Sequence, residues 1–165
     1  MRDKTVYLSL GSNLGNRQEN LSKAIAALER DGIRVTARSS IYESEPQDVR
    51  EQPWFLNQVI ACETRCFPLQ LLTIAQRVER ELGRVRAGVM RRGPRTMDID
   101  ILLFEQVKMQ TARLTIPHPR MLERRFALEP LLEIAPELRE PGSREPLRSY
   151  LARLKAQAVK RMTAV

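Results

Sequence analysis

Hydrophobic and polar residues alternate along residues 4–10, KTVYLSL, which predicts a first β-strand because successive strand side chains point to opposite faces. The stretch GSNLGNR, residues 11–17, follows as a turn. Asn16 with Glu19 three residues later is typical of a helix start. Apolar residues then recur at helical spacing: Leu21, Ile25 and Leu28. The chain is therefore expected to begin with a strand and a helix.

Two further strands are predicted over 34–44 and 54–64, and a second helix begins at Pro68. Its apolar stripe is formed by Leu71, Ala75, Val78 and Leu82. A basic loop, 84–95, then leads into a fourth strand that starts near Met97. The order strand–helix–strand–strand–helix–strand predicts an α+β fold, a ferredoxin-like α/β sandwich with a βαββαβ core and its helices on one face.

Shorter elements are expected beyond this core: a hairpin arm at about 106–116, a helical stretch near 124–135 and a C-terminal helix. The apolar stripe of the last helix would be Leu147, Leu151, Leu154 and Ala158. The sequence shows no internal repeat, low-complexity tract or linker, and 165 residues are enough for one domain with a sizeable core. We therefore expect residues 1–165 to form a single domain.

The composition is that of a globular protein, with 42% hydrophobic and 29% charged residues. No apolar run approaches the ~20 residues of a membrane span, and the first strand begins too early for a signal peptide to precede it. Cys62 and Cys66 fit no zinc or redox motif and are too few for a disulfide framework. These features predict a cytoplasmic protein with two reduced thiols.

The formal net charge of +8, from 28 Lys and Arg against 20 Asp and Glu, indicates a partner that carries negative charge. Much of the excess is arginine, which suits bidentate contacts with phosphate. Composition alone leaves open whether that partner is a nucleic acid, a membrane surface or a phosphorylated small molecule.

In GPRTMDIDILLF, residues 93–104, strict alternation assigns one strand face to Met97, Ile99, Ile101 and Leu103. The other face receives Asp98, Asp100, Leu102 and Phe104. Two carboxylates spaced this way lie ~7 Å apart at their backbones, and their side chains can converge. Such a pair suits magnesium, and two metal ions ~3.5–4 Å apart could be bridged between them. Alternatively, the two aspartates lie on a solvated sheet face, paired with arginines.

Five arginines and no acidic residue lie between Gly83 and Asp98: Arg84, Arg86, Arg91, Arg92 and Arg95. A nucleoside triphosphate needs both metal ions on its phosphate oxygens and cations that neutralise the remaining charge. A solvated basic loop or a nucleic-acid patch is the alternative. Because the arginines adjoin the two aspartates, the triphosphate interpretation is favoured.

Two further features carry weaker signals. Phe55 and Asn57 fall on one face of a predicted strand, where a ring and an amide could hold a flat heterocycle, although Phe55 could equally be a core residue. His118, the only histidine, lies between two prolines and near several arginines, either as a structural residue or as a hydrogen-bond donor to phosphate. The GSNLGNR segment lacks the Gly-Lys-Ser/Thr ending of a Walker A loop, which favours a structural turn.

The segments RRGPRTMDIDILLF and IPHPRMLERRFALEPLLEIAPEL together resemble the signatures of the 6-hydroxymethyl-7,8-dihydropterin pyrophosphokinases of the folate pathway. The segments YLSLGSNLGNR and FLNQV fit the same family, so the resemblance extends from about residue 5 to 155. It implies a single pyrophosphokinase domain, a monomer, that transfers pyrophosphate from MgATP to the hydroxymethyl group, with AMP as leaving group. Its partners would be small molecules, with neither nucleic acid nor membrane.

The resemblance also implies roles for individual residues. Asp98 and Asp100 would hold two magnesium ions and act in catalysis with Arg84 and Arg95. ATP would be bound by Gln76, Glu79, Arg84, Arg86, Arg92, Arg95, Ile101, Arg113, Thr115, His118 and Arg124. The pterin would be bound by Ser44, Glu45, Pro46, Gln47, Phe55, Asn57 and Phe126, with the two phenylalanines sandwiching its ring. Two positions depart from the commonest pattern: Arg92, where several members have tryptophan, and Arg125, where some have glycine.

Two rival functions fit parts of the sequence. An RNA-binding module would explain the positive charge, but the chain has no RNP1 run and only 5% aromatic residues. Asp98 and Asp100 would also repel RNA phosphates. The second rival is another nucleotidyl- or phosphoryl-transferase that uses the same two aspartates on a different acceptor, and the pterin-side residues argue against it only weakly.

Overall fold

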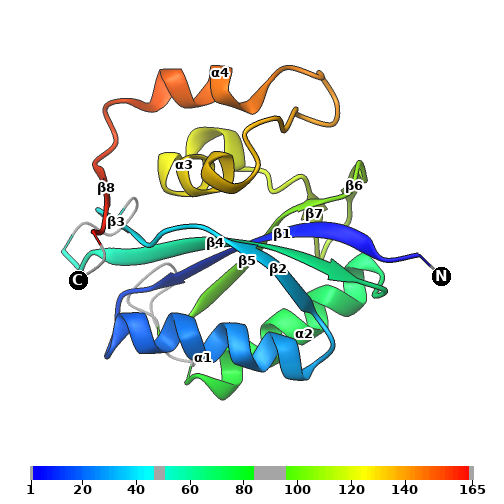
Figure 1. Cartoon of the computed structure of the whole chain (residues 1–165), viewed down its shortest axis with the longest axis horizontal. Coiled ribbons are helices and arrows are strands. Elements are labelled where there is room, and N and C mark those ends of the chain that lie inside the picture. The colour runs from blue at the N-terminus through cyan, green and yellow to red at the C-terminus, as the bar shows by residue number, and fades with distance from the viewer. Residues whose placement is uncertain (1, 47–50, 84–95, 164–165) are drawn as a thin grey trace.

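The computed structural model describes residues 2–46, 51–83 and 96–163 of the chain (Figure 1). The first part of the chain follows the predicted order of strands and helices. Its elements are β1 (Lys4–Ser12), α1 (Arg17–Arg30), β2 (Arg34–Arg38), β3 (Tyr42–Ser44), β4 (Phe55–Thr64), α2 (Pro68–Glu81) and β5 (Asp98–Phe104). Asn16 caps α1 as expected, because its side chain accepts a hydrogen bond from Glu19 N at 3.1 Å.

The strand predicted over 34–44 is divided into β2 and β3, and Ser39 explains the interruption. Its hydroxyl accepts a hydrogen bond from Val59 N at 3.0 Å and donates one to Ser40 O at 2.7 Å. Its carbonyl accepts another from Gln58 Nε2 at 2.9 Å. Ser39 N still donates to Val59 O at 2.9 Å, but these side-chain bonds compete with the regular ladder at this point, as serine side chains commonly do.

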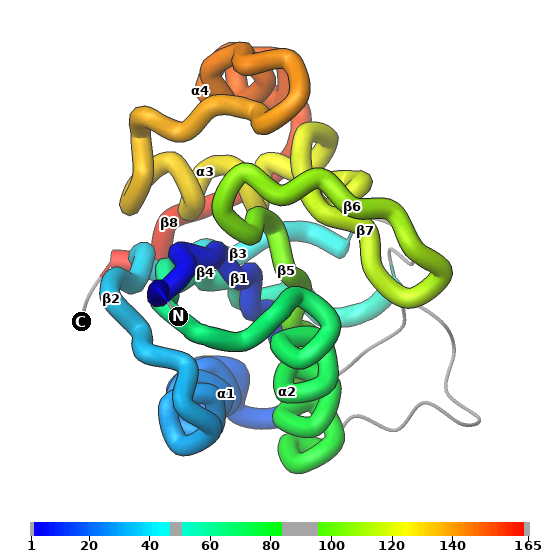
Figure 2. Tube along the Cα trace, turned by 90° about the vertical axis from the view of Figure 1, so that its right-hand side faces the viewer, coloured from blue at the N-terminus to red at the C-terminus, as the bar shows by residue number. Residues whose placement is uncertain are grey.

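All strand pairs formed by the described residues are antiparallel, and the main sheet has the order β5-β1-β4-β3-β8, with β2 also paired to β4. Helices α1 and α2 lie side by side on one face of this sheet, as predicted (Figures 1 and 2). Helix α3 (Arg125–Ile134) covers part of the other face, and α4 (Leu147–Leu151) packs on the far side of α3. The fold is therefore a mixed α/β sandwich with a hydrophobic core on each side of the sheet.

A bulge in β5 reverses the predicted alternation near its end. Leu103 pairs with Tyr7 and Ile101 with Leu8, so Leu102 is the extra residue between them. Leu102 and Leu103 both belong to the core under α3 and α4, whereas Phe104 belongs to the core under α1 and α2. The predicted faces of Leu103 and Phe104 were therefore wrong, because one extra residue turns every later side chain to the other face.

The C-terminal part confirms two predictions and corrects one. Strands β6 (Met109–Gln110) and β7 (Thr115–Ile116) form the expected hairpin arm, and α3 occupies the expected helical stretch. The predicted C-terminal helix is wrong in extent. After a 3-10 turn at Met121–Glu123 and α3, the short α4 and a second 3-10 turn at Ala152–Leu154 lead into β8 (Val159–Arg161).

The corrected segment pairs with the edge of the sheet. β8 lies antiparallel to β3, with Ser44 opposite Val159. Ala158, predicted on a helical stripe, instead bonds to Glu45. The exposed edge of the short β3 offers backbone donors and acceptors that a strand satisfies and a helix does not.

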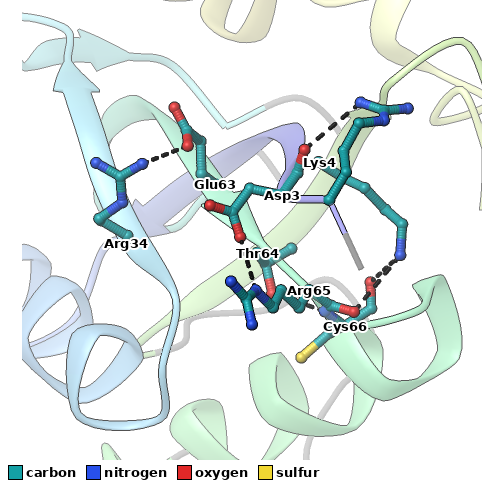
Figure 3. A network of polar contacts seen from close by, with 8 residues as sticks. Asp3, Lys4, Arg34, Glu63, Thr64, Arg65 and Cys66 are labelled. Atoms are coloured by element: carbon teal, nitrogen blue, oxygen red, sulfur yellow. Dashed lines mark hydrogen bonds and ion pairs between the residues drawn. The ribbon is translucent and has the colours of Figure 1, made fainter.

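The charged residues at the N-terminal end of β1 form a network of their own (Figure 3). Arg34 pairs with Glu63 across β2 and β4, and Arg65 Nε lies 3.3 Å from Asp3 Oδ1. Lys4 Nζ donates to the carbonyl of Cys66 at 3.5 Å. Part of the basic excess is thus paired at the sheet edges.

None of the helices in the described part of the chain combines the length and apolar character that a bilayer crossing demands.

Glu133 attaches α3 to the sheet. Its carboxylate accepts hydrogen bonds from Tyr42 Oη at 2.5 Å, from Ser40 N at 2.9 Å and from Ser40 Oγ at 2.9 Å. Partial burial favours the neutral acid, but these bonds outweigh it and hold the pKa of the Glu133 carboxyl below its ordinary value. The ionised form is therefore the one that secures α3.

We expect Glu133→Ala to lower the free energy of unfolding by about 1–2 kcal/mol, because the buried Tyr42 hydroxyl loses its acceptor. The contribution of an acid with a lowered pKa is complete above the unfolded value near pH 4.5 and is lost as the pH falls below it. Urea denaturation should show that the difference in the free energy of unfolding between the wild type and Glu133→Ala is smaller at pH 3.5 than at pH 7. Glu137→Ala, at an exposed position, should change the free energy of unfolding little at either pH. An equal loss at both pH values would contradict this role.

Candidate functional site

The pairing register of β1 with β4 and with β5 determines which residues meet at the site. Gly11 pairs with Asp98 on β5 and with Asn57 on β4, and Ser9 pairs with Asp100 and Val59 in the same way. Directly opposed residues of an antiparallel pair share one face of the sheet. At ~4.8 Å between strands, the backbones of Asp98 and Asn57 lie ~10 Å apart. The acidic pair and the predicted pterin-side amide therefore share a face, with only small side chains between them.

Sequence reasoning missed Gly11 because residues 11–17 were assigned to a turn, and it gave Ser9, within the predicted strand, no part in the site. The structure corrects this, since Gly11 and Ser12 continue β1. A Cβ atom at Gly11 would lie 3.5 Å from Asn57 Oδ1 and 3.7 Å from Phe55 Cδ1. The glycine thus leaves space directly beside the ring and the amide. The signal that could have revealed it is the alternation of small residues, Ser9 and Gly11, with large apolar ones along YLSLGS.

Asn57 has a fixed orientation on the β4 side of the site. Its side chain is buried, and Nδ2 donates to Ser44 Oγ at 2.7 Å and to Tyr42 O at 3.3 Å. Since both amide hydrogens are engaged, the group that it turns toward Gly11 is the acceptor Oδ1. Half-buried Phe55 lies on the same face two residues earlier. Ser44 and Pro46 are buried beside them, while Gln47 lies outside the described residues.

Asp100 meets two basic side chains that are distant in sequence. Its Oδ1 lies 3.8 Å from His118 Nε2, and its Oδ2 lies 3.7 Å from Arg124 Nη1. The guanidinium of Arg124 also lies 5.4 Å from the centre of the Phe126 ring. Arg124 therefore connects the acidic pair to the aromatic residue that begins α3.

His118 is held as a neutral hydrogen-bond donor. Its Nδ1 accepts a hydrogen bond from Arg120 N at 3.1 Å, which leaves the ring proton on Nε2, the atom that faces Asp100. Burial and the positive charge of Arg124, with a smaller effect of Arg120, lower the pKa of His118 to about 4, although Asp98 acts in the opposite direction. At neutral pH the ring can thus donate from Nε2 without carrying charge.

The backbone between the two aspartates is supported from the other side of the sheet. Glu79 of α2 is 3% exposed, and its Oε2 accepts a hydrogen bond from Ile99 N at 2.9 Å. The Ile101 side chain lies in the core under α1 and α2, so it too faces away from the aspartates. These two predicted ATP residues therefore lie beneath the site, where Glu79 holds the start of β5.

The remaining predicted residues lie on different elements and differ in their exposure. Gln76 is half-buried on α2, Thr115 is half-buried in β7, and Arg113 is exposed in the hairpin arm. Half-buried Glu45 follows β3. The predicted residues Arg84, Arg86, Arg92 and Arg95 lie outside the described part of the chain.

The donor set of the acidic pair fits magnesium. Among the described residues, no group of three or more His, Cys, Asp or Glu side chains could enclose a metal ion. Magnesium does not require such a group, because it is commonly held by one or two carboxylates with substrate phosphates and water. Asp98 and Asp100 supply carboxylates of this kind.

Comparison with known proteins adds an independent observation. The model of the 7,8-dihydro-6-hydroxymethylpterin-pyrophosphokinase (HPPK) family matches residues 7–136. The folic acid synthesis protein fol1 of Schizosaccharomyces pombe is 41% identical over 160 residues, 96% of this chain, but the chain spans only 22% of that protein's length. The 2-amino-4-hydroxy-6-hydroxymethyldihydropteridine pyrophosphokinase of Bacillus subtilis is 44% identical over 138 residues, 83% of this chain and 81% of that protein.

A solved structure shares the fold. A crystal structure of HPPK-DHPS in complex with substrates matches with a TM-score of 0.75, covering 93% of this chain and 43% of that one. The sequence identity of this pair is 15%, so the likeness concerns the fold alone.

His118 provides a direct test of the site's electrostatics, because it is the only histidine and its NMR signals cannot overlap with another's. In the metal-free protein we expect a pKa of about 4 and the Nε2-protonated tautomer. Arg124→Met should raise this pKa, whereas Arg148→Met, on exposed α4, should not. A midpoint near the ordinary value of ~6.5 would contradict the described environment.

The same shift predicts how stability depends on pH. The unfolded chain binds a proton near pH 6.5 and the folded chain only near pH 4. The contribution of His118 to stability is therefore complete above pH 6.5 and is lost as the pH falls toward 4. The free energies of unfolding of the wild type and of His118→Gln, measured by denaturation at several pH values, should therefore converge as the pH falls from 6.5 to 4.

Proposed function

Because the chain belongs to the 7,8-dihydro-6-hydroxymethylpterin-pyrophosphokinase family, we propose that it is a pyrophosphokinase of folate synthesis. It transfers the pyrophosphoryl group of MgATP to the hydroxymethyl group of 6-hydroxymethyl-7,8-dihydropterin. The products are AMP and the dihydropterin diphosphate. Its substrates are small molecules, and the active form is a monomer.

The single observation that carries this proposal is the row of residues across three strands. Asp98 on β5 and Asn57 on β4 share a face, and Gly11 of β1 separates them. A metal-bound triphosphate over the carboxylates and a heterocycle over Asn57 would then lie side by side. This neighbourhood supports transfer between the two ligands, because both reacting groups are held over one continuous surface.

Asp98 and Asp100 would hold two magnesium ions. Magnesium bound there supplies charge neutralisation at the phosphates and acidity at a coordinated hydroxyl. Arg124, 3.7 Å from Asp100, binds phosphate oxygens beside the acidic pair. His118 donates from Nε2 to a phosphate oxygen while remaining neutral. Arg84 and Arg95, outside the described residues, complete the catalytic set in this proposal.

The remaining residues of the proposed ATP site are Gln76, Glu79, Arg86, Arg92, Ile101, Arg113 and Thr115. Within this set, Glu79 acts through β5 because its side chain bonds to Ile99 N. Ile101 can contact the nucleotide only through its backbone, since its side chain is in the core of the opposite face. Both residues therefore support the phosphate site from below rather than line it.

On the other side, Phe55 and Phe126 stack on the two faces of the pterin, and Asn57 binds its edge. Asn57 presents Oδ1, so the pterin groups that it recognises are N–H donors. The backbone of Ser44–Pro46 completes this pocket, with Ser44 fixed by its bond to Asn57, and Gln47, outside the described residues, belongs to the same set in this proposal.

We also infer that residues 1–165 act as one pyrophosphokinase domain of ferredoxin-like type. The order β5-β1-β4-β2, in which both helical connections cross over an intervening antiparallel strand, supports this classification. β3 and β8 then extend the strand next to β4.

Asp98→Asn and Asp100→Asn test the phosphate half of the proposal. Each should reduce AMP formation from MgATP and the dihydropterin by about a thousandfold or more, since the lost metal contacts contribute on the order of several kcal/mol. Circular dichroism should show that the fold survives, and Asp3→Asn, an exposed residue of the network in Figure 3, should retain activity. Formation of ADP, or full turnover in both variants, would refute the proposal.

Gly11→Ala tests the pterin half. The added methyl group makes only ordinary contacts with Asn57 and Phe55, so the fold persists, but it fills the space beside Oδ1. We expect the KM for the dihydropterin to rise roughly tenfold, as for the loss of ~1.4 kcal/mol of binding, with little change in the KM for ATP. Gly142→Ala, whose methyl group would meet only the flexible Glu140 side chain, is the matched control. An unchanged KM for the dihydropterin would exclude a ligand at this position.

A further inference from the structure

Residues 155–161 run from the start of α3 to the outer edge of β3, first as a turn and then as a strand, and we call this segment the C-terminal brace. Its last three residues are β8, paired with β3. Lys155 and Gln157 contact the junction between the 3-10 turn Met121–Glu123 and α3. The brace thus connects two elements that flank the pterin side of the site.

Gln157 caps α3 from a distance. The residue at the N-cap position, Arg124, makes no side-chain capping bond, although the first N–H groups of a helix need acceptors. Gln157 Oε1 accepts from Arg125 N at 2.8 Å, and Gln157 Nε2 donates to Glu123 O at 2.6 Å. One side chain therefore holds the residues on both sides of Arg124.

Arg125 completes this end of the brace. Its Nη1 donates to Gln157 O at 2.8 Å and to Lys155 O at 3.5 Å, and its Nε donates to Glu129 Oε2 at 2.7 Å. The charge of Arg125 is therefore directed toward Glu129 and the backbone of the brace. A residue that is glycine in some relatives here stiffens the start of α3 rather than adding a phosphate contact.

The other end of the brace holds the residues that follow β3. Ala158 N donates to Glu45 Oε1 at 3.3 Å, and Glu45 N donates to Ala158 O at 3.4 Å. Val159 lies opposite Ser44, whose hydroxyl accepts the hydrogen bond from Asn57. The backbone and the side chain of Glu45 are thus bonded to the same short segment that caps α3.

We propose that the C-terminal brace positions the pterin. The brace sets the distance between the two sides of the pterin site, Ser44–Pro46 on one side and Phe126 on the other. Gln157 and Arg125 are its positioning residues, and neither needs to touch the substrate. This inference rests on the proposed function. It assigns a role to residues beyond 155, which the family resemblance and the matched family model do not cover.

The brace predicts a selective effect on one substrate. In Gln157→Ala the KM for the dihydropterin should rise roughly tenfold, as expected when two hydrogen bonds are lost. The KM for ATP should change less than twofold. Asp100 is paired with His118 and Arg124, whereas the brace bonds to Glu123, Arg125 and Glu45. Equilibrium binding of 6-hydroxymethylpterin with a non-hydrolysable ATP analogue, followed by fluorescence, should weaken by the same factor.

Two further variants separate positioning from general stability. Lys160→Ala alters an exposed side chain of β8 and should leave both KM values unchanged. Arg125→Leu should reproduce the selective rise, and the double variant with Gln157→Ala should exceed the larger single effect only slightly, because both act through one segment. If one variant fails to fold, the other still provides the comparison.

The outcomes are distinguishable from those that test the function itself. If the wild type turns over and the folded variants keep an unchanged KM for the dihydropterin, the positioning role of the brace is refuted and the proposed function still stands. Equal rises in both KM values would also overturn it, because they would indicate general loosening. Absence of AMP formation by the wild type would refute the proposed function instead.

Discussion

Gly11 and Ser9 each pair with a residue of β4 on one side and of β5 on the other, and the rest of the site depends on this double register. A shift of one residue in either pairing would turn Asp98 and Asp100, or Phe55 and Asn57, into the core under α1 and α2. The apolar residues between them prevent such a shift, because Leu8, Leu10 and Ile60 are completely buried on that side. Core packing thus holds the polar face in position.

The same face must accommodate two neighbouring carboxylates without a large electrostatic cost. Arg124 and His118 lie within 4 Å of Asp100, and neither comes from the strands of the sheet. Arg124 contributes a full charge, whereas burial keeps His118 neutral and so preserves the net negative charge that a cation requires. The balance leaves the site attractive both to metal ions and to the phosphates that accompany them.

The second layer of helices explains why the site has two unlike halves. α3 is attached to the sheet through Glu133 and brings Phe126 toward the β4 side. The loop before it brings His118 and Arg124 toward β5. Residues 118–134 therefore contribute to both halves, and Gln157, from near the C-terminus, holds the start of α3 within them. The long-range bonds of the brace secure a helix that lacks a local cap.

Local sequence patterns are enough to predict the alternation of strands and helices through β5, the shared face of the two aspartates and the start of α1 at Asn16, because periodicity and capping are local properties. The bulge at Leu102 could not be predicted in this way, since an extra residue is recognisable only against its partner strand. The strand at 159–161 could not be predicted either, because it depends on bonds offered by the edge of β3 that no local pattern reveals. The meeting of Asp100 with His118 and Arg124, and of Asn57 with Gly11, had the same origin: contacts between distant segments follow from strand register and helix docking, which sequence spacing does not specify.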